Sequence, residues 1–79
     1  MFDKIKRWRQ KREDTKLLKY SMRVFRSVYP YASTETQACL AQTLWNLARA
    51  YGEQWDAKLG QFCYDEIHKI VMMNKGLSD

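Results

Sequence analysis

The stretch "LLKYSMRVFRSVYP", residues 17–30, predicts the first helix of the fold. On a helical wheel of about 100° per residue, its apolar side chains cluster around a single direction, as in a helix that packs on one side. Pro30 ends the pattern, because the residue before a proline resists helical conformation. We therefore predict a helix over residues 15–29. Its inward stripe consists of Leu17, Leu18, Met22, Val24, Phe25, Val28 and Tyr29.

The apolar residues that precede this stripe do not continue it. On the wheel they point in one common direction, which is roughly opposite to that of the stripe. Since one straight helix cannot bury both sets against one core, two arrangements are open. Either the helix breaks near "REDT", where Asp14 or Thr15 caps a new start, or the first turns face something other than the core. The residues in question are Phe2, Ile5 and Trp8.

We accordingly divide the chain into a basic amphipathic N-terminal arm, residues 1–14, and a single helical domain, residues 15–79. Two further helices are predicted in this domain, over residues 34–51 and 54–74. Thr34 and Gln37 have the spacing of a capping box, and Gly52 suits the position just after a helix. The inward stripes contain Leu40, Ala41, Leu44, Leu47, Ala48 and Tyr51 in the first, and Leu59, Phe62, Cys63, Ile67, Ile70 and Val71 in the second.

The expected fold is therefore all-α: a compact three-helix domain with a basic amphipathic N-terminal helical extension. One proline and three glycines in the whole chain favour long helices over a many-stranded sheet. A domain of this size buries only about 60% of the surface of its unfolded chain, so the core is thin and self-association would help. A homodimer is one expected consequence.

Charge is distributed unevenly along the chain. Residues 1–26 hold ten Lys or Arg against three acids, a net +7, while residues 27–79 hold four against six, a net −2. The segment "KIKRWRQKR", residues 4–12, has six cations and no acid. Such asymmetry points to an anionic partner of the N-terminal part, and an interleaved aromatic residue suits stacking on an unpaired base. The predicted nucleic-acid contacts are Lys4, Lys6, Arg7, Trp8, Arg9, Lys11, Arg12, Lys16, Lys19, Arg23 and Arg26.

Other interpretations of the basic segment stay open. It fits a solvated arm that keeps the protein in solution, a segment that folds back on the core, or peripheral attachment to an anionic membrane surface. It also fits a protein-interaction or inhibitor module of phage or plasmid accessory type, binding an acidic patch on a host protein or nucleoprotein complex. The side chains predicted to anchor a protein interface are large and lie off the inward stripes: Tyr20, Trp45, Tyr64 and Met72.

The sequence offers little for catalysis. Its one histidine, His68, is five residues from Cys63, which places the two on different faces of a helix and not in nucleophile–base contact. With Cys39 they make at most three ligands, without the paired spacing of a zinc site. We predict no enzyme, no cofactor and no metal site. Without an export signal or an apolar run long enough for a membrane span, we expect a cytoplasmic protein with reduced thiols.

Overall fold

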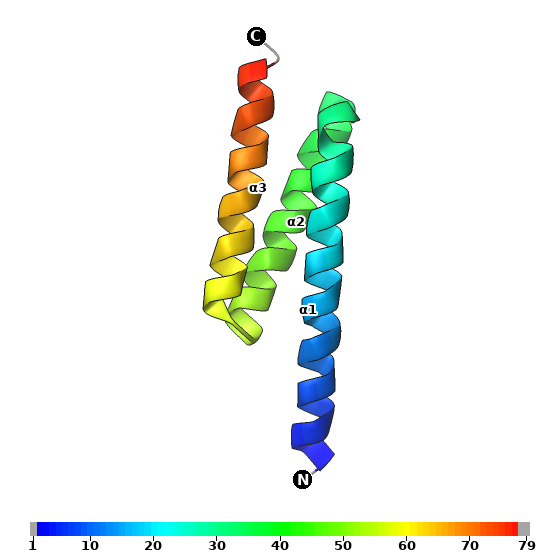
Figure 1. The fold of residues 1–79 in the computed structure, drawn as a ribbon, viewed down its shortest axis with the longest axis vertical. Helices are drawn as coiled ribbons and strands as arrows, with labels where there is room; N and C mark the ends of the chain where they lie inside the picture. The colour runs from blue at the N-terminus through cyan, green and yellow to red at the C-terminus, as the bar shows by residue number, and fades with distance from the viewer. Residues whose placement is uncertain (1, 78–79) are drawn as a thin grey trace.

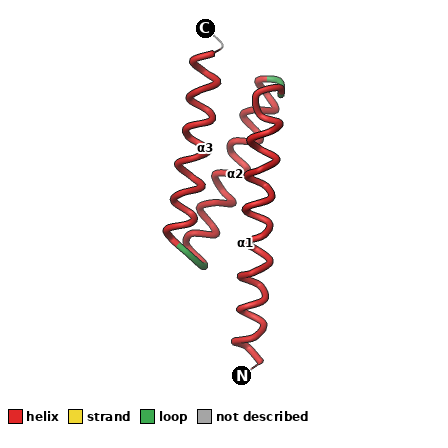
Figure 2. Tube along the Cα trace, viewed as in Figure 1, coloured by secondary structure: helices red, strands yellow, loops and turns green. Residues whose placement is uncertain are grey.

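The computed structural model describes residues 2–77, which form three α-helices and one short 3₁₀ turn (Figure 1). Helix α2 and helix α3 make an antiparallel hairpin, and α1 lies alongside it and extends past its closed end (Figures 1 and 2). The predicted three-helix, all-α fold with an N-terminal helical extension is confirmed. The elements are α1 (Phe2–Val28), η1 (Tyr29–Tyr31), α2 (Thr34–Gln54) and α3 (Ala57–Leu77).

Helix α1 runs without interruption through the segment where a break was one of two predicted arrangements. The side chains that were candidates to cap a new helix bond within α1 instead. The Thr15 hydroxyl donates to the Lys11 carbonyl at 2.7 Å, and Asp14 accepts from the Gln10 amide at 2.9 Å. The helix break is therefore wrong, and the other arrangement holds: the first turns of α1 face something other than the core.

The core joins all three helices, and α1 contributes to it along a narrow seam. Leu18, Met22 and Phe25 of α1 and Tyr29 of η1 are buried at spacings of three and four residues, the seam of a helix packed on one side. The rings of Phe25 and Tyr29 lie 4.9 Å apart. The other buried hydrophobic residues are Ala41, Leu44, Ala48 and Tyr51 from α2, and Cys63, Ile67 and Val71 from α3.

Four residues of the predicted inward stripes are exposed, which corrects the wheel analysis. Leu17, Val24 and Val28 lie outside the buried seam of α1, because the hairpin covers only one side of that helix. Phe62 of α3 is 60% exposed. A stripe read from the sequence was thus wider than the surface that the neighbouring helices cover.

The start of α2 is capped one residue earlier than predicted. Ser33 is the N-cap, and its hydroxyl accepts from the backbone N–H of Thr36 at 3.3 Å. Thr34 is instead the first helical residue. The Gln37 side chain does not close a capping box but donates to the Tyr29 carbonyl at 2.7 Å, so it ties α2 to η1, directly after α1.

The turn between α2 and α3 is short and capped by one carboxylate. Gly52, predicted to follow the helix, lies inside α2, which continues to Gln54. Asp56 Oδ1 accepts from the backbone N–H of Lys58 at 3.0 Å and of Leu59 at 3.2 Å. Asp56 is therefore the N-cap of α3. The negative charge of its carboxylate also interacts favourably with the positive end of the helix dipole.

We expect the Asp56→Ala substitution to lower the free energy of unfolding by about 1 kcal/mol, because two backbone donors lose their acceptor. Urea denaturation monitored by circular dichroism measures the change. The Asp56→Asn variant is the control, since its amide oxygen still accepts both hydrogen bonds. An Asn variant as unstable as the Ala variant would show that the cap is not the source of the stabilisation.

Helices α2 and α3 approach backbone to backbone near their connection. A Cβ atom built on Gly60 would lie 2.5 Å from Gly52 Cα and 2.8 Å from the Ala48 carbonyl oxygen. No side chain fits at Gly60 without moving the helices apart. This contact explains why a glycine lies inside α3. It also sets the distance between the two helices of the hairpin on which α1 packs.

Candidate nucleic-acid interface

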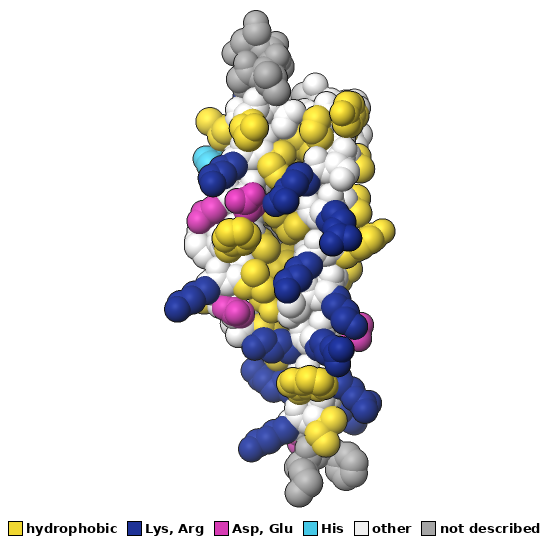
Figure 3. All heavy atoms as spheres, viewed as in Figure 1, with side chains coloured by type: hydrophobic (Ala, Val, Ile, Leu, Met, Phe, Trp, Pro, Cys, Tyr) yellow, Lys and Arg dark blue, Asp and Glu magenta, His cyan; other side chains and the backbone are white. Residues whose placement is uncertain are grey.

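The cations predicted to contact nucleic acid are all on α1, and every one is exposed. Figure 3 shows Lys and Arg side chains in a column along α1, with the acidic side chains of this face mainly on α3. One uninterrupted helix therefore carries the whole predicted set, from Lys4 to Arg26. Because Lys4 and Arg26 are 22 residues apart and the rise is 1.5 Å per residue, the cations extend over about 33 Å.

Five of these cations form what we call the basic stripe: Arg12, Lys16, Lys19, Arg23 and Arg26. Their spacings of four, three, four and three residues place them on one face of α1, one per helical turn. The stripe continues toward the N-terminus through Trp8. All five residues are among the predicted nucleic-acid contacts, but the prediction did not recognise this periodicity.

The basic stripe borders a shallow hollow between α1 and α3. Lys19, Arg23 and Arg26 line the hollow from α1, and Leu59 and Phe62 line it from α3. Figure 3 shows hydrophobic side chains between the two helices in this region. A row of cations therefore lies beside an apolar surface that is open to solvent.

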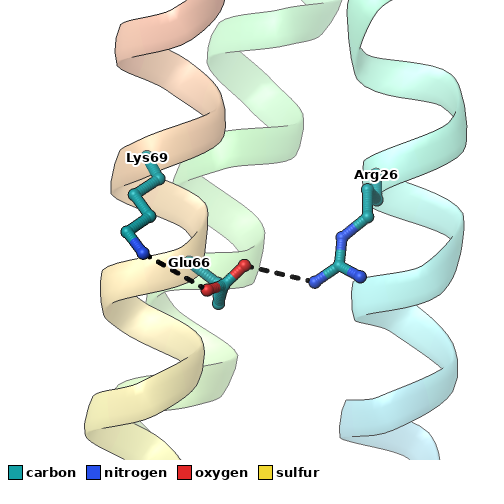
Figure 4. Close-up of polar contacts among 3 residues, drawn as sticks. All are labelled: Arg26, Glu66 and Lys69. Carbon is teal, nitrogen blue, oxygen red and sulfur yellow. Dashed lines mark hydrogen bonds and ion pairs between the residues drawn. The ribbon is translucent and has the colours of Figure 1, made fainter.

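One ion pair connects the end of the stripe to α3. Arg26 Nη2 lies 3.3 Å from Glu66 Oε2, and Lys69 Nζ lies 3.9 Å from the other carboxylate oxygen of Glu66 (Figure 4). Such partly exposed pairs contribute at most about 1 kcal/mol. Among the residues that the structure describes, the other four cations of the stripe form no ion pair, so their charge is available to a partner.

Two aromatic side chains adjoin the basic stripe at different points. Trp8 is 60% exposed and shares a second hollow with Lys11, Arg12, Lys16 and Lys19. The Arg12 guanidinium lies 5.5 Å from the centre of the Trp8 ring, a cation–π contact that holds the ring beside the cations. Phe62, missed as a site residue because it was assigned to the core, offers its ring near the other end of the stripe.

The basic N-terminal arm, whose cations lie in residues 4–12, is held to the hairpin at its base. Trp55 Nε1 donates to Asp14 Oδ2 at 2.9 Å, and the hydroxyls of Thr15 and Tyr51 lie 2.6 Å apart. The Arg7 guanidinium lies 5.1 Å from the centre of the Trp55 ring. Arg7 is thus a structural contact as well as a predicted phosphate ligand, and Trp55 is a residue that the sequence analysis did not single out.

The predicted protein-interface residues come from all three helices. Tyr20 is exposed on α1, and Tyr64 and Met72 are exposed on α3. Trp45 is not the exposed anchor that was expected: it packs against the core, with its ring centre 6.0 Å from that of Tyr64. Within residues 2–77 its indole N–H is buried and has no hydrogen-bond acceptor.

The cysteines and the histidine do not come together in a reactive group. Cys63 is buried in the core, and burial, assisted by the nearby charge of Glu66 and opposed by Lys19, raises the pKa of its thiol. Cys39 and His68 are exposed. In the described part of the chain, no three His, Cys, Asp or Glu side chains gather into a set able to hold a metal ion.

Among residues 2–77, none of the helices is both long and apolar enough to cross a membrane. No protein-family model, curated protein or solved structure matches the chain.

Proposed function

We propose that this protein binds nucleic acid through the basic stripe and the basic arm of α1, without catalysing a reaction. The observation that supports the proposal is the regular row of cations on one face of a rigid helix, four of them without an ion-pair partner among the described residues. Cations held in a row displace counterions from a phosphate backbone, which is the main source of sequence-independent affinity.

The two aromatic rings beside the stripe favour single-stranded nucleic acid. Trp8 and Phe62 are exposed, and both lie next to cations of the stripe. A groove that tracks the backbone with cations and stacks unpaired bases on aromatic rings is the usual design of a single-strand binder. In a duplex the bases are already stacked on one another, so these rings would have no flat surface to contact.

The first experiment is a fluorescence anisotropy titration of labelled single- and double-stranded oligonucleotides at a series of salt concentrations. The test variant replaces three exposed stripe cations that form no ion pair among the described residues: Arg12→Gln, Lys16→Gln and Arg23→Gln. The control variant replaces Arg49→Gln, Lys58→Gln and Lys69→Gln, which lie on α2 and α3. Both variants lose three positive charges, so their net charges are equal.

We expect the stripe variant to bind single strands at least about tenfold more weakly at low salt, and the slope of log K against log salt to become shallower by about 2. The control variant should retain the slope of the native protein. If both variants weaken equally, net charge alone governs binding and the stripe is not the site. No binding of the native protein at low salt would favour the interaction with an acidic protein patch or with an anionic membrane surface.

A further inference from the structure

Helix α1 carries a second row of side chains, on a different face from the basic stripe, and this row is apolar and exposed. Leu17 is 53% exposed, Tyr20 65%, Val24 39%, Val28 43% and Tyr31 90%. We call these five residues the apolar stripe. Their spacings of three, four, four and three residues follow one face of α1 and continue into η1. The hairpin does not cover this face.

The apolar stripe itself carries no charge, and the cations Lys16 and Arg23 border it beside Tyr20. Within the stripe the intervening residues on the same face are Ser21 and Ser27. Contacts at both ends, between Thr15 and Tyr51 and between Tyr29 and Gln37, place this part of α1 beside residues 37–51 of α2. Helix α2 has no charged residue from Thr36 to Ala48. In a chain that is 29% charged, an uncharged surface across two helices is unusual.

We propose that this surface is a homodimer interface in which α1 packs antiparallel against α1 of a second copy. A chain of net charge +5 repels its own copies, so close approach requires a face without cations, and the apolar stripe is such a face. An acidic partner, by contrast, would be recognised by the basic stripe. An anionic lipid surface would likewise be drawn to the cations and not to this side of α1.

The order of the residues in the stripe suits a two-fold axis at Val24. In an antiparallel pair centred there, Val24 faces its own copy, Tyr20 faces Val28 of the second copy, and Leu17 faces Tyr31. Each contact then occurs twice, as a two-fold symmetric interface requires. The part of the arrangement on α1, from Leu17 to Val28, extends along about 17 Å.

Electrostatics selects the antiparallel over the parallel orientation. A parallel pair would place the two basic arms, residues 4–12, side by side, with six cations on each. An antiparallel pair places the arms at opposite ends of the dimer. The basic stripe of each copy stays exposed, because it occupies another face of α1.

Sedimentation equilibrium over about 10–300 μM protein tests the association, because a reversible dimer dissociates on dilution. We expect a mass of twice the chain's 9.5 kDa at the upper concentrations. Added salt should strengthen the dimer, since it screens the repulsion between two cationic chains. A monomer at all concentrations and salt levels would overturn the proposal.

Matched variants locate the interface. Tyr20→Lys together with Tyr31→Lys replaces two largely exposed side chains, so the fold should be retained, and we expect the dissociation constant to rise at least about tenfold. Met72→Lys together with Met73→Lys places the same charges on exposed positions of α3 and is the control. Circular dichroism confirms that each variant is folded. A folded Tyr20/Tyr31 variant that dimerises like the control would overturn the proposal.

Cross-linking with a short bismaleimide tests the orientation, in a Cys39→Ser background that removes the exposed thiol. Val24→Cys should give covalent dimers, because the two thiols meet at the symmetry axis. Arg9→Cys should give no covalent dimers, because an antiparallel pair places the two thiols at opposite ends of the dimer. Efficient cross-linking through Arg9→Cys, or none through Val24→Cys, would contradict the antiparallel arrangement.

Discussion

The Gly60→Ala substitution is expected to lower the free energy of unfolding by about 2 kcal/mol or more, although alanine is the better helix former by about 1 kcal/mol. The new Cβ would meet three backbone atoms closer than 3.0 Å: Gly52 Cα, Gly52 N and the Ala48 carbonyl oxygen. Backbone atoms cannot rotate away as a flexible side chain does, so α2 and α3 must separate. Overpacking of this kind costs about 1–3 kcal/mol and sometimes more.

Gly52→Ala is the matched control for this contact. A Cβ on Gly52 would lie 3.4 Å from Gly60 Cα and 3.8 Å from Ala57 Cα, which is ordinary contact. Because both glycines lie inside helices, both substitutions gain the same helix propensity, and only the steric cost differs. We expect the Gly52 variant to be as stable as the native protein or up to about 1 kcal/mol more stable. Urea unfolding at one fixed protein concentration measures both, and equal effects would contradict the close approach.

The Phe25→Ala substitution is expected to lower the free energy of unfolding by about 3–5 kcal/mol. Phe25 is 1% exposed and its ring packs against that of Tyr29, so its removal leaves a cavity where α1 meets the hairpin. A domain of this length has a total stability of about 4–12 kcal/mol. The variant should therefore be partly or wholly unfolded at 25 °C, as measured by the loss of helical circular dichroism.

Phe62→Ala is the control for Phe25, because it deletes the same ring at an exposed position of α3. We expect it to change the free energy of unfolding by less than about 0.5 kcal/mol. If both phenylalanines proved equally sensitive, Phe62 would have to be buried in solution. The comparison also decides whether Phe62 is free to serve as the second stacking ring proposed for nucleic acid.

Local rules were enough to predict the number, type and approximate bounds of the helices. Pro30 marks the end of α1, and the apolar periodicity after Leu17 marks the start of its buried seam. Both signals come from residues that are close together in the sequence. The expected helix ends differ where the structure depends on distant contacts. Gly52 resembles a helix terminator in sequence, yet it lies within α2, where its backbone closely approaches Gly60 of α3.

The direction of residues 2–13 could not be derived from the sequence for a similar reason. The wheel showed correctly that Ile5 and Trp8 do not continue the core stripe, but the same pattern fits a broken helix or a straight one. The choice depends on Trp55, which lies 41 residues from Asp14 in the chain and donates to its carboxylate. The uncharged surface of α1 and α2 was likewise hidden, because Leu17, Val24 and Val28 fit a core stripe equally well.

The hydrogen bonds at the base of the arm fix α1 to the hairpin at one level, and the turns before that level project past the hairpin (Figure 1). The helix is clamped where Asp14 meets Trp55 and Thr15 meets Tyr51, and the part before the clamp extends for about 18 Å. A tilt of about 10° at the clamp would displace the start of α1 by about 3 Å, roughly the rise between successive nucleotides of one strand. Small changes at two hydrogen bonds would therefore move Lys4 and Lys6 by about 2–3 Å relative to a bound phosphate backbone, while Arg12, next to the clamp, would hardly move.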